Sequence, residues 1–242
     1  MNRSTKLENY LENECSFDLV RNVSNLGEVD RSTTPTPIVE LFYRFGEGDY
    51  PENINSYIEP LDQDEFANQV YDYCRENTNG NSFRPETKEA WIQRIKKAWA
   101  SIVRDVHFAF MMFEYQEKND CFDMVDFSIE KDINAGADFI IENDNQTYHI
   151  NLFINSKKSR QFFNKKKKER QANKEAIDIE VPMNFGGPKK ELDNRGNSIW
   201  LYNENHIQSI DDIINTNNCY ATNNKYGDTL CKISQYSINK VA

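Results

Sequence analysis

Two short apolar runs joined by a polar turn constrain the fold of this chain more than any other feature. The first run covers 139–142 and the second covers 148–154, and Asn143-Asp144-Asn145-Gln146 separates them. Apolar runs on either side of an Asn/Asp-rich turn are typical of a β-hairpin. We therefore predict two adjacent antiparallel strands, at 137–142 and 147–154, in the middle of the chain.

A long amphipathic helix precedes this hairpin. Pro85 in a first turn, followed by the acidic residues Glu86 and Glu89, suits the start of a helix. Large apolar residues then recur at steps of three and four residues, namely Trp91, Ile95, Ala98, Trp99, Ile102, Val106 and Phe110. This spacing predicts a helix from Pro85 to about residue 113, with the stripe buried.

The remaining elements complete an α/β pattern. We predict strands at 122–130, 177–181 (ended by Pro182), 198–202 and 230–236, and helices at 61–74, 157–176 and, capped by Ser209, 209–214. The hairpin requires an antiparallel pair, and the helix between the third and fourth strands permits a parallel one. The expected fold is α/β, with a mixed central sheet flanked by helices.

The 242-residue chain divides by composition into three segments. Residues 1–37 are predicted to be a flexible N-terminal arm that ends in a Ser/Thr/Pro-rich linker, and 38–84 an acidic N-terminal subdomain. Residues 85–242 are the predicted α/β core domain. The sequence leaves open whether the first 80 residues or so form a separate domain or pack onto the sheet.

Charge is distributed unevenly along this acidic chain, whose formal net charge is −10. There are ten acidic and two basic residues over 39–80, whereas 157–174 contains nine basic residues. The net charge argues against a protein that coats nucleic acid in general, because phosphate contacts need Lys and Arg. The basic segment is either a local phosphate-binding patch or a solvated helix face.

The five cysteines are widely spaced, and no CxxC pair occurs. A structural zinc site is therefore not expected. We read the cysteines as reduced thiols of a cytoplasmic protein, because no signal peptide is recognisable. No apolar run is long enough to span a membrane, so no membrane association is expected. The oligomeric state is open.

Asp138 at the start of the second central strand, and Lys157 after the end of the third, resemble a known arrangement. Together with the order helix–strand–strand–strand–helix–strand, they make the region from about residue 85 to 202 similar to the restriction-endonuclease-like, or PD-(D/E)XK, superfamily. The resemblance implies a nuclease core in which Asp138 binds Mg²⁺, a hard cation that prefers oxygen ligands and activates water beside a phosphodiester. It also implies a nucleic-acid substrate and a place in a prokaryotic restriction or antiviral defence system, with a partner protein of that system.

The chain departs from the family pattern in its third strand, which lacks the Glu-x-Lys that supplies a second metal ligand and a lysine. The nearest substitute is Asn155-Ser156-Lys157, in which Asn155 offers a neutral carbonyl ligand and Lys157 stabilises the attacking water or the phosphate. Further polar groups on this strand are Thr147, His149 and Asn151. A second carboxylate would have to come from elsewhere, with Asp132, Glu114 and Glu89 as candidates.

Asp132 is also a candidate metal ligand by position. Asp132 and Asp138 are six residues apart across a turn that contains Gly136, so their carboxylates could converge. A turn held by Asx hydrogen bonds is the competing interpretation.

Two basic groups are candidate phosphate-binding sites. Arg104 and His107 share a face of the long helix, which predicts either an anion site with His107 as acid–base catalyst, or an ion-paired Arg104 beside a half-buried His107. After the third strand, the residues expected to contact phosphates are Ser159, Arg160, Lys165, Lys166, Lys167 and Arg170.

Three functions remain open from the sequence. The first is a metal-dependent nuclease with the site around Asp138. The second is a non-catalytic binding module, whose acidic half docks a partner protein and whose basic helix binds a nucleotide or an acidic surface. The third is a nucleotide-modifying enzyme that uses Arg104 and His107.

Overall fold

A computed structural model describes residues 2–17, 62–77, 88–127, 137–157, 160–161, 176–184, 187, 189–194 and 197–224. The chain forms two compact units, Met1–His107 with Glu191–Leu201, and Phe108–Lys190 with Tyr202–Ala242. The boundaries that we predict at 37/38 and 84/85 lie outside the described residues, so the three-segment division stays a prediction.

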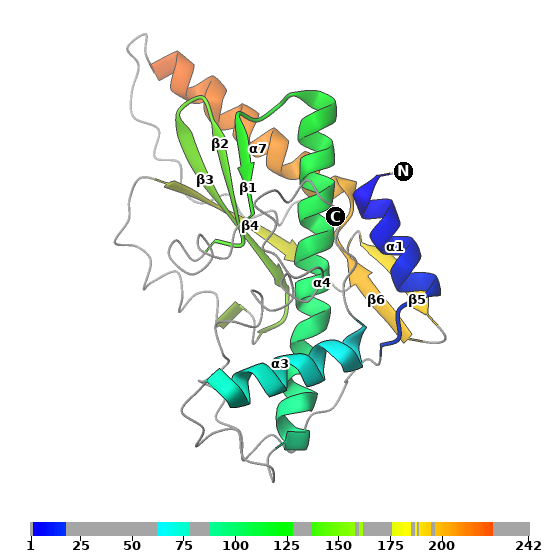
Figure 1. The fold of residues 1–242 in the computed structure, drawn as a ribbon. Coiled ribbons are helices and arrows are strands. Elements are labelled where there is room, and N and C mark those ends of the chain that lie inside the picture. Colours follow the sequence, from blue (N-terminus) through cyan, green and yellow to red (C-terminus); the bar gives the residue numbers. More distant parts are fainter. Residues whose placement is uncertain are drawn as a thin grey trace. The chain divides into compact units, whose positions relative to one another are not determined.

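The first unit contains a helix that the sequence does not predict. Helix α1 spans Arg3–Asn13, within the segment expected to be a flexible arm (Figure 1). Leu7 and Leu11 are four residues apart, on one helix face, and both are completely buried. The polar composition of 1–37 gives little sign of this helix, because only two large apolar residues of the helix are buried.

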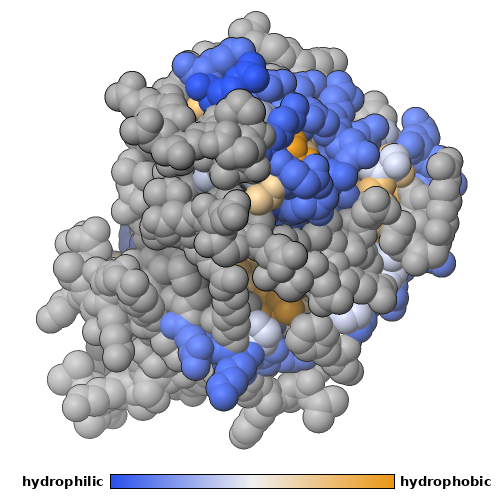
Figure 2. Space-filling view, turned by 90° about the horizontal axis from the view of Figure 1, so that it is seen from below, coloured by the Kyte–Doolittle hydropathy of each residue, from blue (hydrophilic) through white to orange (hydrophobic). Residues whose placement is uncertain are grey.

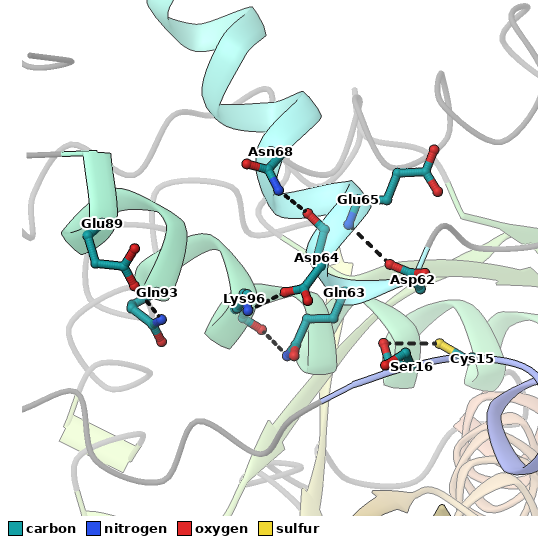
Figure 3. A network of polar contacts seen from close by, with 10 residues as sticks. All are labelled: Cys15, Ser16, Asp62, Gln63, Asp64, Glu65, Asn68, Glu89, Gln93 and Lys96. Carbon is teal, nitrogen blue, oxygen red and sulfur yellow. Dashed lines mark hydrogen bonds and ion pairs between the residues drawn. The ribbon is translucent and has the colours of Figure 1, made fainter. Parts of the chain in front are cut away.

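Helix α3 (Gln63–Asn77) packs against α4 (Lys88–Asn119) through polar contacts at its first turn (Figure 3). Gln63 Nε2 donates to the Lys96 carbonyl at 3.0 Å, and the Lys96 ammonium forms an ion pair with Asp64. Asp62 Oδ1 caps the helix by accepting the Glu65 amide at 3.1 Å. The apolar side of α3 is buried and consists of Phe66, Ala67, Val70, Tyr71 and Cys74. The predicted helix at 61–74 is thus confirmed, with its start and end shifted toward the C-terminus.

Helix α4 extends beyond its predicted end near residue 113. Six of the seven stripe residues are buried, namely Trp91, Ile95, Trp99, Ile102, Val106 and Phe110, whereas Ala98 is half-buried. The helix ends at Asn119, and the next residue, Asp120, adopts φ 49° and donates its amide to the Gln116 carbonyl at 2.8 Å. A residue in the left-handed region is a common helix stop. The units divide inside α4, between His107 and Phe108.

The first unit also contains a two-stranded sheet formed by β5 (Lys190–Asn194) and β6 (Asn197–Leu201). Strand β6 corresponds to the strand predicted at 198–202. Strand β5 is not predicted, because its charged and polar residues do not show the alternation of a half-buried strand.

The second unit contains a four-stranded mixed sheet in the order β1-β2-β3-β4 (Figure 1). Its strands are β1 (Met124–Asp126), β2 (Phe139–Asn143), β3 (Gln146–Ile154) and β4 (Ala176–Met183). The pairs β1–β2 and β2–β3 are antiparallel, and β3–β4 is parallel. The predicted α/β class with a mixed sheet and flanking helices is confirmed at this level.

The hairpin between β2 and β3 has the expected turn. Asp144 and Asn145 have φ angles of 51° and 62°, both in the left-handed region. Two consecutive residues of this kind make the turn type that matches the twist of a hairpin, and Asn and Asp tolerate it better than other non-glycine residues.

Several predicted boundaries differ from the structure. Of the strand predicted at 122–130, β1 covers Met124–Asp126, and 128–136 lies outside the described residues. The helix predicted to run to residue 176 is wrong at its end, because Ala176 already belongs to β4, and most of its length lies outside the described residues. Pro182 does not end β4, which continues to Met183 at the sheet edge, a position where proline is tolerated.

The C-terminal helix is longer than predicted. Helix α7 spans Glu204–Asn224, and Ser209 lies inside it instead of capping it. The Ser209 hydroxyl donates to the Asn205 carbonyl at 2.7 Å, within the helix. The strand predicted at 230–236 lies outside the described residues.

The two faces of the four-stranded sheet differ in chemistry. One face is apolar and carries Phe139, Ile141, Tyr148, Ile150, Ile179 and Val181, all of which are buried. Phe108 of α4 packs edge-on against Phe139, with ring centroids 5.5 Å apart. The opposite face carries Glu142, Thr147, His149, Asn151, Asp178 and Glu180, together with Ile140, the buried strand partner of His149. The strand register therefore gathers polar groups of three strands on one face.

The described surface is mostly polar in the view of Figure 2, in keeping with the mean hydropathy of −0.81. None of the helices within the described residues is long and apolar enough to cross a membrane.

Candidate functional site

Asp138 is fixed to strand β3 by two hydrogen bonds. Its amide donates to the Ile150 carbonyl at 3.0 Å, and its Oδ2 accepts the Leu152 amide at 2.5 Å. Ile150 and Leu152 are alternate residues of β3, so their backbone groups face the same neighbouring strand. At Leu152 the acceptor of the amide is the Asp138 carboxylate in place of a backbone carbonyl. These two bonds place Asp138 beside Asn151.

Asn151 is paired in turn with Glu180 on the parallel strand β4. The Asn151 side chain is buried, with 4% of the residue exposed, and its Nδ2 donates to the His149 carbonyl at 3.3 Å. Glu180 is half-buried. Asp138, directly before β2, and Asn151 and Glu180 on β3 and β4 therefore lie at about one level of the sheet, and we call these three residues the carboxylate row.

A His–Asp pair lies next to the carboxylate row on the same sheet face. His149 and Asp178 are strand partners, two residues before Asn151 and Glu180. His149 Nδ1 lies 3.9 Å from Asp178 Oδ1, and 18% and 37% of the two side chains are exposed. The pair is an ion pair when the imidazole is protonated.

Asp178 and Glu180 are functional candidates that the sequence reasoning missed. The signal for them is the alternation Ile177-Asp178-Ile179-Glu180-Val181, which puts both carboxylates on one face of the predicted strand. Their position opposite His149 and Asn151 depends on the parallel register of β3 and β4, which the sequence does not specify.

The residues of β3 that lie next to Asp138 are not Asn155 and Lys157. Asn151-Leu152-Phe153 is the stretch of β3 alongside Asp138, so an amide and an aromatic ring occupy the positions where the family pattern would have a carboxylate and a lysine. Asn155 and Lys157 lie beyond the end of β3 at Ile154, and Lys157 is exposed.

Asn155 belongs to a separate hydrogen-bond chain. Its Nδ2 donates to Asn184 Oδ1, and its Oδ1 accepts from Arg160 Nε. Its backbone amide donates to the Met183 carbonyl at 2.8 Å, which continues the β3–β4 ladder. The oxygen that we expected to bind a metal thus holds an arginine.

His107 and Arg104 lie in the first unit, and each contacts another side chain there. His107 is completely buried, not half-buried, and its Nε2 lies 2.8 Å from Glu8 Oε1 on α1. No group within the described residues pairs with its Nδ1. Arg104 Nη2 donates to Ser101 Oγ at 3.1 Å. His107 therefore joins α1 to α4.

Two of the other candidate carboxylates, Glu89 and Glu114, lie on α4. Glu89 belongs to the first unit and accepts a hydrogen bond from Gln93 at 2.8 Å, and Glu114 is half-buried on α4. The candidates that lie outside the described residues are Asp132, Ser159, Lys165, Lys166, Lys167 and Arg170.

The donor chemistry of the carboxylate row fits Mg²⁺. Within the described residues there is no group of three or more His, Cys, Asp or Glu side chains arranged to hold a metal ion. Mg²⁺, however, keeps several waters and needs only one or two protein carboxylates beside substrate phosphates. Asp138 and Glu180 provide two carboxylates, and Asn151 provides a carboxamide.

Two described cysteines are unsuited to nucleophilic catalysis. Burial raises the pKa of the Cys74 thiol to about 11. Burial, followed by the charge of Asp211, raises the pKa of Cys121 to about 11. Both thiols therefore stay protonated near neutral pH, and the thiolate is the reactive form.

No protein-family model matches the chain, and neither a curated protein nor a solved structure matches it. We therefore base the proposed function on the carboxylate row and on the basic residues that follow β3.

Proposed function

We propose that the chain is a metal-dependent nuclease with a restriction-endonuclease-like core, in which Asp138 and Glu180 hold Mg²⁺. The observation that carries the proposal is the carboxylate row, in which Asp138 is bonded beside Asn151 and Glu180 is the strand partner of Asn151. Glu180 replaces the carboxylate that the family pattern would place on the third strand. We further propose a cytoplasmic location and a role in a restriction or antiviral defence system.

The arrangement of the elements supports this core. Helix α4 is followed by three antiparallel strands and then by a strand parallel to β3, as the resemblance implies, and the helix that it also implies between the third and fourth strands lies mostly outside the described residues. Among the described residues, exposed Lys157 and Arg160 follow β3 directly. Both cations would bind the phosphate groups of a nucleic acid.

Asp138, Glu180 and Lys157 would have separate roles in this reaction. Asp138 and Glu180 lie on strands separated by β3, so their backbones are about 10 Å apart, and the longer Glu180 side chain would reach toward Asp138 over Asn151. A bound Mg²⁺ would supply a Lewis acid for the phosphodiester and an activated water. Lys157 would neutralise charge on the phosphate.

A non-catalytic binding module is the second candidate. The observation that favours it is the replacement of the expected carboxylate and lysine by Asn151 and Phe153 on β3. In this function the acidic half would dock a partner protein, and Lys157 and Arg160 would bind a nucleotide or an acidic surface without cleavage.

A cleavage assay distinguishes the two functions. Purified full-length protein would be incubated with plasmid DNA and with RNA, in Mg²⁺, in Mn²⁺ and with a chelator, beside the variants Asp138→Asn and Glu180→Gln. Asn is preferred to Ala at 138 because its carboxamide oxygen can still accept the Leu152 amide. Glu142→Gln is the matched control, since Glu142 is an exposed carboxylate of β2 that pairs with Thr147, away from the row.

Metal-dependent cleavage that both row variants lose and the control retains supports the nuclease. Cleavage that survives Glu180→Gln contradicts the assignment of the second ligand. Binding without cleavage in any metal supports the binding module.

A further inference from the structure

The carboxyl ends of the parallel strands β3 and β4 are joined by a chain of three polar side chains. Asn184 follows β4, Asn155 follows β3, and Arg160 lies five residues further on. Asn184 Oδ1 accepts from Asn155 Nδ2, and Asn155 Oδ1 accepts from Arg160 Nε. The two carboxamides thus link a residue after β4 to an exposed arginine after β3.

The backbone around these side chains is held in place on both strands. The Asn155 amide donates to the Met183 carbonyl at 2.8 Å, one rung beyond the Ile154–Met183 pair. After β4, the Gly187 amide donates to the Asn184 carbonyl at 3.2 Å. Both asparagines are half-buried, whereas Arg160 is exposed.

A side chain at Gly187 would crowd Asn184. A Cβ atom added at this position would lie 3.0 Å from Asn184 Cβ, which is tighter than nine in ten real Cβ contacts. An alanine at 187 would therefore require Asn184 to shift by a few tenths of an ångström.

We propose that Arg160 is a phosphate clamp of the nucleic-acid site and that Asn184 is its positioning residue, acting through Asn155. The clamp rests on the proposed nucleic-acid substrate and adds to it a residue from a distant segment. A guanidinium fixed through Nε presents a planar fork that suits phosphate oxygens, and fixing it beforehand reduces the entropy lost on binding. The carboxyl ends of parallel strands are also where α/β sheets bind their ligands.

The test is nucleic-acid binding by the full chain as a function of salt. Labelled single-stranded DNA, duplex DNA and RNA would be titrated between about 50 and 200 mM salt, with Ca²⁺ in place of Mg²⁺ as the hard cation. The variants are Arg160→Ala, Asn184→Ala, the double variant and Gly187→Ala. Lys97→Ala, which removes an exposed lysine of the first unit, is the control for charge, and Asn68→Ala, at an exposed asparagine of α3, is the control for the amide.

The clamp predicts a specific pattern among these variants. Arg160→Ala weakens binding roughly tenfold and reduces the salt slope on duplex DNA by about 0.9, the value for one lost phosphate contact. Asn184→Ala weakens binding roughly three- to tenfold but reduces the slope less, because the charge remains. In the Arg160→Ala background, Asn184→Ala has no further effect, and Gly187→Ala alone weakens binding by no more than Asn184→Ala.

Three results would overturn the clamp. They are additive losses for Arg160→Ala and Asn184→Ala, an unchanged salt slope in Arg160→Ala, and the absence of binding to all three probes by the wild-type protein. The outcome is separate from that of the nuclease proposal. Arg160-dependent binding without cleavage would support the clamp and contradict the nuclease. Metal-dependent cleavage with unchanged binding in Arg160→Ala would support the nuclease and contradict the clamp.

Discussion

The Asp138 carboxylate accepts the backbone amide of Leu152 at 2.5 Å, so a candidate metal ligand also holds the end of the β2–β3 ladder. The same carboxylate is therefore both a hydrogen-bond acceptor within the sheet and the proposed metal ligand. This double role decides which substitutions can test function at Asp138, because a variant that loses the hydrogen bond changes the sheet as well as the charge.

Asp138→Ala is predicted to destabilise the protein by roughly 1–3 kcal/mol, because the Leu152 amide loses its acceptor in a partly buried place. Asp138→Asn retains an oxygen at the same position and should cost less. Urea denaturation of the two variants beside wild type measures the difference. Equal stabilities for both variants would mean that the hydrogen bond contributes nothing to the fold.

Glu8→Ala is predicted to destabilise the first unit by roughly 1–3 kcal/mol, because it leaves both nitrogens of the buried His107 without a partner among the described residues. The matched control is Glu12→Ala, which removes an exposed glutamate one turn further along α1. Thermal or urea unfolding checks the prediction. A loss of stability in the control equal to that in Glu8→Ala would contradict a specific role for the His107 contact.

The protein is predicted to lose stability as the pH falls below 6.5, through His206. Burial lowers the pKa of His206 below its ordinary value of 6.5 in the folded state. The unfolded chain therefore takes up a proton at a higher pH than the folded chain, and the free energy of unfolding decreases as the pH falls from 6.5 toward the folded-state pKa.

His206→Gln should remove this part of the pH dependence. The measurement is the free energy of unfolding of wild type and variant between about pH 5 and 8, a range that brackets the ordinary histidine pKa, with the difference plotted against pH. A difference that does not vary with pH would show that His206 binds protons equally in both states.

Tyr115→Phe is predicted to destabilise the second unit by roughly 1–2 kcal/mol, because the Tyr115 hydroxyl donates to Asp211 Oδ2 at 2.8 Å. Asp211 is buried and would keep its contact with Asn215 at 3.1 Å. Urea unfolding at neutral pH checks the loss, with Asp212→Asn, at an exposed neighbour, as control.

The same hydrogen bond gives Tyr115 a second signature. Burial, and then the bond to Asp211, raises the pKa of Tyr115 to about 12. The stabilisation is present below pH 10, the ordinary tyrosine pKa, and is lost as the pH rises through the folded-state value. A spectroscopic titration that finds Tyr115 ionising near pH 10 would contradict the hydrogen bond.

The hairpin and the long helix could be predicted from the sequence because their signals are local. The turn at Asp144 and Asn145 combines residues that tolerate positive φ, and the α4 stripe follows the helical period over several turns. Helix α1 could not be predicted, because it is held by the buried side chains of Leu7 and Leu11 and by the contact of Glu8 with His107, a residue far along the chain.

The candidate site was predictable only in part, for the same reason. Asp138 stands at the start of a recognisable strand, but its neighbour Asn151 and the partner Glu180 follow from the register of three strands. Register depends on contacts between distant segments, whereas Asn155 and Lys157 are polar residues near the end of β3 in the sequence itself. The bond from Asn155 to Asn184 is likewise a long-range contact.

The central claim is that Asp138 and Glu180 together hold the metal of a nuclease, and metal-dependent cleavage by Glu180→Gln tests it most directly. Wild type, Glu180→Gln and Glu142→Gln would be compared on plasmid DNA and RNA at equal concentration, after urea unfolding has shown that all three are folded. The account predicts cleavage in Mg²⁺ or Mn²⁺ by wild type and Glu142→Gln, and a loss of at least about 100-fold in Glu180→Gln, in the range that follows removal of a main charge-stabilising group. Cleavage by Glu180→Gln at the wild-type rate, or no cleavage by the wild-type protein in either metal, would contradict it.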